Sequence, residues 1–261
     1  MQKCCKIGIN TLFLLVQLTL LTSLAQGQAV QVDAMGAIWH LDGNDINKID
    51  HDGNLLESYN NLLLGNPTSI DVSDPFKILV FYRESQNILL INNDANTIGK
   101  PVNLSDFGLG EITHACRSNR GGVWLYHRVS AELVRLDQRF TSIVQRIPFS
   151  TSEHNLHPNH LAQHNGVLYA GINNNIVIRM DEYGTILPQF QISYKNDFRI
   201  QNDKLWATHK SQTVGYNLKK TEENPEHYHC SCQELAVIID NKPMCFDGEK
   251  LRLCKKINPL P

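Results

Sequence analysis

The feature that most limits how this chain can fold is an apolar motif that recurs about every forty residues. Each copy is a short apolar strand containing an aromatic or equivalent residue, which we call its anchor. Successive anchors are 42, 43, 45, 37 and 39 residues apart. The six anchors are Trp39, Phe81, Trp124, Tyr169, Trp206 and Cys245. A fixed period of this length is typical of repeat architectures, in which each copy is one supersecondary unit.

Further strands flank each anchor. A second strand ends in an apolar residue followed by Asp or Asn, as at residues 48–50 and 135–137, and these polar residues are interpreted as turn formers rather than acids. Another apolar stretch precedes each anchor, and a weaker one follows the turn. Four short strands repeated six times predict an all-β, six-bladed β-propeller over residues 28–261, with 39 residues per blade. The alternative, a β-sandwich, has no tandem period.

The last blade is predicted to be short or incomplete. Its strands would lie at about 235–239, 243–246 and 250–253, which leaves only residues 254–261 for an outer strand. Pro259 and Pro261 cannot donate ladder hydrogen bonds, so a normal fourth strand is not expected there. We expect the open edge either to be covered by this tail or to accept a strand from another protein. The sequence leaves open how the ring closes.

The first 27 residues have the order of a secretory signal peptide: Lys3 and Lys6, an apolar run from Thr11 to Leu24, then small residues. The run is too short to span a bilayer, so no membrane span is expected after cleavage. Both Cys4 and Cys5 precede the run, which argues against lipid attachment. We therefore expect an exported protein.

The net charge of −2 provides no basic field for nucleic acid.

Several segments resemble an exported propeller family of Bacteroidota. The similarity covers about residues 29–220, and its most specific segments are 67–82, 88–93, 104–109 and 122–126. The resemblance implies a six-bladed propeller that works in the periplasm or at the cell surface. It implies no established activity and transfers no catalytic residue.

Four of the five cysteines that follow the signal segment lie within 25 residues of one another. In an exported protein this clustering predicts two disulfides among Cys230, Cys232, Cys245 and Cys254, in one of three pairings. The weaker alternative is a zinc or copper site. Its ligands would be His227, His229, Cys230 and Cys232. The fifth, Cys116, is expected to be a buried apolar residue.

One polar residue per blade is expected to line the central channel. The candidates are Asp33, Asp71, His114, His160, Asp197 and Glu234. No catalytic motif occurs in the sequence, so neither a catalytic residue nor a cofactor is predicted. The favoured function is a non-enzymatic protein–protein interaction scaffold of the cell envelope, with another envelope or secreted protein as its partner. The alternative is a lactonase-like hydrolase that uses a metal in the channel.

Overall fold

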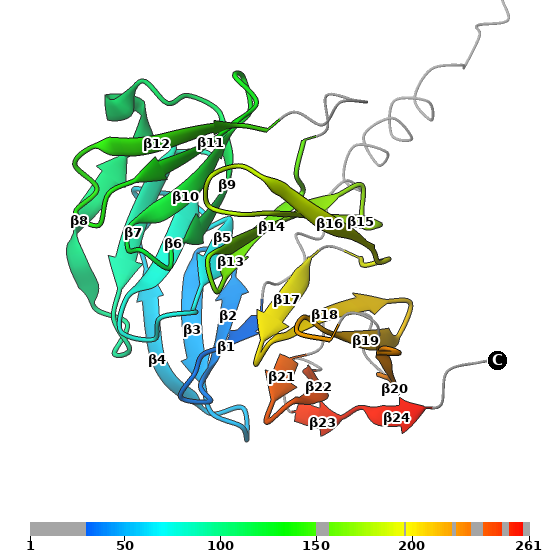
Figure 1. The fold of residues 1–261 in the computed structure, drawn as a ribbon. Helices are drawn as coiled ribbons and strands as arrows, with labels where there is room; N and C mark the ends of the chain where they lie inside the picture. Colours follow the sequence, from blue (N-terminus) through cyan, green and yellow to red (C-terminus); the bar gives the residue numbers. More distant parts are fainter. Residues whose placement is uncertain are drawn as a thin grey trace, which may run out of the picture.

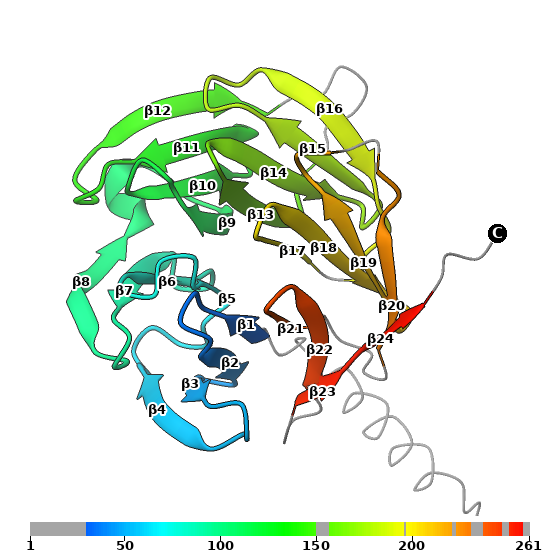
Figure 2. The same cartoon turned by 60° about the horizontal axis from the view of Figure 1, so that its bottom comes forward.

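The chain forms six antiparallel sheets arranged as a wheel, seen most clearly in Figure 2. This computed structural model describes residues 30–149, 157–195, 197–220, 223–230, 237–246 and 251–257. The predicted six-bladed β-propeller is confirmed. The predicted signal peptide, residues 1–27, lies outside the described residues.

We number the sheets as blades one to six in chain order (Figure 1). Blades one to three each have four strands. Blade one consists of β1 (Val30–Val32), β2 (Ile38–Asp42), β3 (Asp45–Ile49) and β4 (Leu55–Asn60). Blade two consists of β5 (Ser69–Asp71), β6 (Ile78–Tyr82), β7 (Asn87–Ile91) and β8 (Thr97–Asn103). Blade three consists of β9 (Ile112–Arg117), β10 (Val123–His127), β11 (Glu132–Leu136) and β12 (Ile143–Pro148). A 3-10 helix, η1 (Leu104–Phe107), joins blades two and three.

Blades four to six differ in strand number: four, five and three. Blade four consists of β13 (His160–His164), β14 (Val167–Ile172), β15 (Ile176–Met180) and β16 (Ile186–Gln191). Blade five consists of β17 (Phe198–Gln201), β18 (Lys204–His209), β19 (Gln212–Asn217), β20 (Glu226–His229) and β24 (Lys255–Ile257). Blade six consists of β21 (Val237–Ile239), β22 (Lys242–Phe246) and β23 (Leu251–Leu253).

Each anchor lies on the second strand of its blade, where neighbouring blades cover both faces of the sheet. All five residues of β6 are buried for this reason, whereas nearly every residue of the outer strand β8 is exposed. A strand covered on both faces reads as a continuous apolar run rather than as an alternating pattern. The anchor runs therefore stand out in the sequence, and the outer strands do not.

In blades one and three, a basic residue on the third strand packs over the ring of the anchor tryptophan. Lys48 lies opposite Trp39 in the register, and its Nζ is 5.7 Å from the centre of the indole. Arg135 lies opposite Trp124 in the same way, with its guanidinium carbon 5.7 Å from the ring centre. Such cation–π contacts add to the apolar burial of the ring. The basic residue that precedes the apolar residue and Asp at the end of these third strands therefore packs against the anchor ring.

The Asp and Asn residues that end the third strands hold the following turns. Asp50 Oδ1 accepts hydrogen bonds from the backbone N–H groups of Asp52 and Asn54, at 2.9 and 2.8 Å. The same arrangement recurs at Asn92 and Asp181, and Asp137 Oδ1 accepts the N–H groups of the residues four and five positions on. The interpretation of these residues as turn formers is therefore confirmed.

The ring closes without a strand shared between its two chain ends, within the residues that the structure describes. Strand β1 stays in blade one and lies next to β21, the first strand of blade six. The two blades meet through Val30, Ile38, Ile49 and Val237. The tail does not complete blade six: β24 pairs with β20 and so belongs to blade five. Blade six is left with three described strands.

Candidate functional site

The first strands of the blades surround the middle of the wheel and carry most of the predicted channel residues (Figure 2). Asp71, His114 and His160 lie on β5, β9 and β13, and Asp197 directly precedes β17. Asp33 follows the end of β1, at the turn to β2. The five described candidates therefore lie at different positions relative to the first strands of their blades. Glu234 lies outside the described residues.

Asp33 is a structural acceptor rather than a channel residue. Its side chain is buried, and Oδ1 accepts the backbone N–H groups of Met35 and Ala37 at 2.9 and 3.0 Å. Its Oδ2 accepts the indole Nε1–H of Trp39 at 2.9 Å. Because its oxygens are committed to the turn and to the anchor, Asp33 holds blade one together and has no free carboxylate oxygen for the channel.

Asp71 joins two blades near the axis. Its Oδ1 accepts the backbone N–H of Ser73 at 3.0 Å. Its Oδ2 accepts the backbone N–H of Arg117, on blade three, at 2.7 Å. A carboxylate that accepts two backbone N–H groups is held in one orientation. Asp71 is thus a fixed negative charge between blades two and three.

His114 is a neutral imidazole at the axis. Burial lowers its pKa to about 3, and electrostatic repulsion of its imidazolium form by Arg83 and His160 acts in the same direction. Its Nδ1 lies 3.0 Å from Thr113 Oγ1, and the Thr113 carbonyl accepts the Nε–H and Nη2–H groups of Arg83. A neutral imidazole has one donor and one acceptor nitrogen. With such a low pKa, His114 is a weak base.

His160 lies beside His114 in a mixed electrostatic environment. Burial lowers its pKa; Asp197 and Asp71 oppose that shift, and Arg199 reinforces it. The ring packs edge-to-face on Phe198, with the centroids 4.7 Å apart. The imidazole is therefore held against blade five, between a carboxylate and a guanidinium.

Arg199 is the axial residue that sequence reasoning missed. It lies on β17 opposite Trp206, and burial lowers its pKa while Asp197 opposes the shift. Its Nε and Nη1 are shielded from water and have no hydrogen-bond partner among the described residues. Buried polar atoms are normally paired, so this guanidinium is available to an acceptor in the channel. The signal in the sequence was a basic residue inside the apolar strand 198–200.

The thiol of Cys116 supplies no nucleophile to this axial cluster. The side chain is buried, as expected from the sequence, and the thiol is not part of a disulfide. Burial raises its pKa, and the negative charge of Asp71 raises it further. A reactive cysteine needs an electropositive setting that lowers its thiol pKa. The surroundings of Cys116 raise its thiol pKa instead, so the reactive thiolate form is disfavoured.

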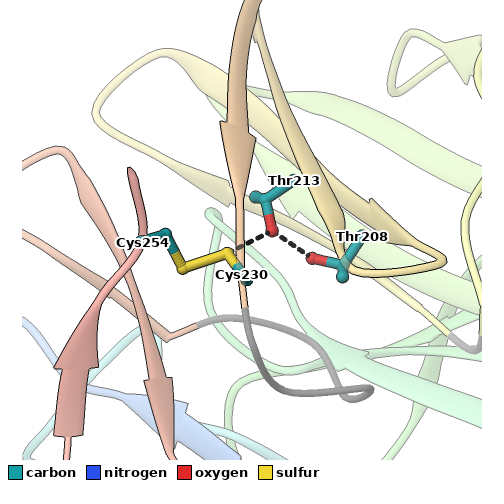
Figure 3. The surroundings of a disulfide bond; sticks show 4 residues. All are labelled: Thr208, Thr213, Cys230 and Cys254. Atoms are coloured by element: carbon teal, nitrogen blue, oxygen red, sulfur yellow. Dashed lines mark hydrogen bonds between the residues drawn. A yellow bond between two sulfur atoms is a disulfide. The ribbon is translucent and has the colours of Figure 1, made fainter. Parts of the chain in front are cut away.

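The cysteines of the last blade form a covalent link between blades five and six. Cys230, just after β20, is bonded to Cys254, between β23 and β24 (Figure 3). Thr213 Oγ1 lies 3.1 Å from the Cys230 sulfur and 2.8 Å from Thr208 Oγ1. Both hydroxyl groups are buried, and each is a hydrogen-bond partner of the other in the interior. The disulfide fixes the point at which the chain leaves blade six for blade five.

Cys245 is also disulfide-bonded. Cys232 lies outside the described residues. Two disulfides were predicted among the four candidate cysteines, and the one whose two partners are both described, Cys230–Cys254, is confirmed.

Of the predicted metal ligands, the three that the structure describes, His227, His229 and Cys230, do not form a metal site, and Cys232 lies outside the described residues. The sulfur of Cys230 is used in the disulfide and is not a thiolate ligand. His227 and His229 share one face of β20, and the buried Tyr228 between them points to the other face. In the described parts of the chain, no group of three or more His, Cys, Asp or Glu side chains could hold a metal ion. Within the same residues, no helix is long and apolar enough to cross a bilayer.

No protein-family model matches the chain, and no curated protein matches it. Solved structures do share its fold. The chain is similar to a catalytically inactive virginiamycin B lyase from Staphylococcus aureus with quinupristin: 14% identity, TM-score 0.56, covering 89% of this chain and 86% of that one. It is similar to a protein of unknown function from Bacteroides caccae: 12% identity, TM-score 0.53, covering 88% and 82%. It is also similar to BBS1N in complex with ARL6DN: 12% identity, TM-score 0.54, covering 88% and 78%. At these identities the likeness shows the propeller fold alone.

Proposed function

We propose that this protein is an exported, non-enzymatic scaffold of the cell envelope that binds another envelope or secreted protein. The signal-like segment at residues 1–27 and the resemblance to exported propellers of Bacteroidota support export. The polar loops of a rigid propeller are suited to binding other proteins. A propeller of similar fold is described in complex with a second protein, ARL6DN, which is consistent with this use of the fold.

The observation that carries the proposal is the outer edge of blade six. Strand β23 pairs only with β22 among the described strands. Cys254 N donates to Pro243 O at 2.9 Å, so the alternation along the strand turns the N–H and C=O of Leu253 away from β22. The side chain of Leu253 is 63% exposed. An open edge with an exposed apolar residue is suited to an added strand.

The described part of the tail, residues 255–257, does not cover this edge, because it continues onto the neighbouring blade. Directly after Cys254, β24 pairs with β20, with Lys255 opposite His229 and Ile257 opposite His227. Of the two outcomes expected for the open edge, this arrangement favours the one in which another protein supplies the strand. The partner would present an extended segment with an apolar residue facing Leu253.

The test is capture of a partner from envelope extract by tagged wild-type protein, Leu253→Pro and Leu253→Val. Proline removes the outward N–H and blocks strand addition, whereas valine keeps the N–H and the apolar side chain. We expect one stoichiometric partner with the wild type and with Leu253→Val. We expect about tenfold less or none with Leu253→Pro, provided its thermal unfolding is unchanged. Equal recovery by all three proteins would rule out the edge as the binding site.

A second candidate function, a lactonase-like hydrolase, rests on the axial cluster. The groups that could orient a substrate carbonyl or acid there are His160, Asp197 and Arg199, whose Nε and Nη1 have no hydrogen-bond partner among the described residues. A panel of lactones and esters, assayed with and without divalent ions and with His160→Gln as control, tests it. Turnover that His160→Gln abolishes would favour this candidate, and a panel without turnover would leave the scaffold as the better proposal.

A further inference from the structure

A polar pocket of about 310 Å³ lies where the first strands of blades two, three and four end. It is separate from the open edge of blade six and from the axial imidazoles. Ser73 and Asp74 follow β5, Ser118 and Asn119 follow β9, and Gln163 lies on β13. The other lining residues are Lys77, Arg117, Gly121 and Gln138. Its volume is at the lower end of the range for small-molecule sites, which suits a ligand of metabolite size.

Two amide side chains of the pocket are oriented by backbone groups. The backbone N–H of Asn119 donates to Gln163 Oε1 at 2.8 Å. The backbone N–H of Gly166 donates to Asn119 Oδ1 at 3.1 Å. Each amide oxygen already accepts a hydrogen bond, and the NH₂ groups of Asn119 and Gln163 remain available as donors. Neither NH₂ group has a hydrogen-bond partner among the described residues.

Cations outnumber carboxylates in the lining. Lys77 Nζ has no partner among the residues described, and the buried Nε of Arg117 has none either. The rest of the Arg117 guanidinium contacts Asp74 Oδ2 at 3.7 Å and the Gly122 carbonyl at 3.3 Å. Asp74 Oδ1 accepts the backbone N–H of Phe76 at 3.0 Å. The one carboxylate is therefore already engaged, and Lys77 is left uncompensated.

We propose that this pocket binds a small oxyanion, the carboxylate or phosphate group of a small organic molecule. The donors still available in it include the ammonium of Lys77 and the NH₂ groups of Asn119 and Gln163. An oxyanion offers only acceptors and forms charge-assisted hydrogen bonds with such a set. A neutral sugar would also need acceptors, and the amide oxygens of Asn119 and Gln163 already accept backbone N–H groups.

The test is calorimetric titration of the full-length protein with inorganic phosphate, citrate and glucose. Gln163→Glu keeps the oxygen that accepts the Asn119 N–H but replaces the donor with a negative charge. Lys77→Gln removes the ammonium. Lys100→Gln, at an exposed position of β8, is the matched control. Thermal unfolding of each variant shows that it is folded.

We expect phosphate or citrate to bind wild type and Lys100→Gln equally, and glucose not to bind. Gln163→Glu should weaken the anion by about tenfold to a hundredfold, and Lys77→Gln by about tenfold. Phosphate binding without citrate binding would identify a phosphate group, and the reverse a carboxylate. Binding of glucose alone, no anion bound at about 10 mM, or affinity unchanged in both pocket variants would overturn the proposal.

Discussion

Two blade boundaries bury a tryptophan in different ways. Between blades three and four, Trp124 packs in a cluster of twelve buried apolar residues that include Tyr126 and Leu161. Between blades five and six, Trp206 belongs to a cluster of six described buried residues, of which three are cysteines. An anchor tryptophan is thus covered by apolar side chains at one boundary and, among the described residues, largely by cysteine side chains at the other.

The difference teaches how a propeller can tolerate a short blade. A blade with three strands presents less apolar area to its neighbour, and the hydrophobic stabilisation falls with that area. The Cys230–Cys254 disulfide and the transfer of β24 to blade five join the two blades directly. A disulfide stabilises mainly by restricting the unfolded chain, so it does not depend on the buried area.

Blade five also adapts its third strand to this boundary. Where blades one and three place a cation opposite the anchor, blade five has Gly215 opposite Trp206. A Cβ at Gly215 would lie only 2.6 Å from the indole ring, so the ring occupies the space that a side chain would need. The cation comes instead from Lys204, whose Nζ is 5.5 Å from the ring centre.

The largest effect is expected at the regular boundary. Trp124→Ala should lower the free energy of unfolding by about 3–5 kcal/mol, because the indole is fully buried among apolar groups. Denaturant unfolding measures this change. Val129→Ala, at a 71% exposed position of the same blade, should change stability by less than about 0.5 kcal/mol. A loss below about 1 kcal/mol at Trp124 would contradict the account of the apolar boundary.

At the last boundary, replacing both Cys230 and Cys254 with alanine should cost about 2–4 kcal/mol. Hydrogen exchange should show the loss of protection first in β21, β22 and β23, while blade three keeps its protection. Wild-type protein unfolded under reducing conditions provides the matched comparison. Uniform loss of protection around the ring would mean that the disulfide supports the whole wheel rather than its last blade.

A smaller effect is expected from pH at the regular boundary. The pKa of His114 falls from 6.5 to about 3 on folding, because burial disfavours the imidazolium. Between these two pKa values only the unfolded chain takes up the proton. The contribution of His114 to the free energy of unfolding is therefore fully present above about pH 6.5, and it falls by about 1 kcal/mol per pH unit as the pH decreases toward 3.

His114→Gln should therefore flatten the pH dependence of the unfolding free energy between pH 6.5 and 4.5, relative to wild type. His209→Gln, at an exposed position of β18, serves as the control and should follow the wild-type curve. An unchanged slope in His114→Gln would show that the imidazole titrates alike in the folded and unfolded chains.

The smallest effect concerns two corresponding turns. Asp33 and Ser118 each precede an anchor tryptophan by six residues. The backbone N–H of Asp33 donates to Ala37 O at 3.0 Å, and that of Ser118 donates to Gly122 O at 3.2 Å. The turns are therefore built alike, but only the first has a carboxylate.

The indole Nε1–H of Trp39 donates to Asp33, whereas that of Trp124 is buried without a partner among the described residues. Ser118→Asp should supply the missing acceptor and stabilise the protein by about 1 kcal/mol, the net value of a typical hydrogen bond after burial of the carboxylate. Denaturant unfolding tests this, with Ser118→Ala as control. Destabilisation by Ser118→Asp would show that the desolvation cost exceeds the gain.

Some of the candidate site could be predicted from the sequence, and some could not. His114 and His160 were expected at the axis because a propeller brings its first strands there. The role of Asp33 was missed because its partner, the indole of Trp39, is reached through a turn whose geometry the residue types do not specify. Arg199 was missed because burial, not residue type, makes its guanidinium unusual.

By itself the sequence determined the number of blades, the positions of the anchors and the turn-forming role of Asp50 and its equivalents. These follow from local spacing and residue type, which repeat along the chain. Only the tertiary structure decided that β24 joins blade five, that Cys230 pairs with Cys254, and which donors face the polar pocket. Those outcomes depend on which distant segments the curvature of the ring brings within bonding distance, and that geometry is not written in any local pattern.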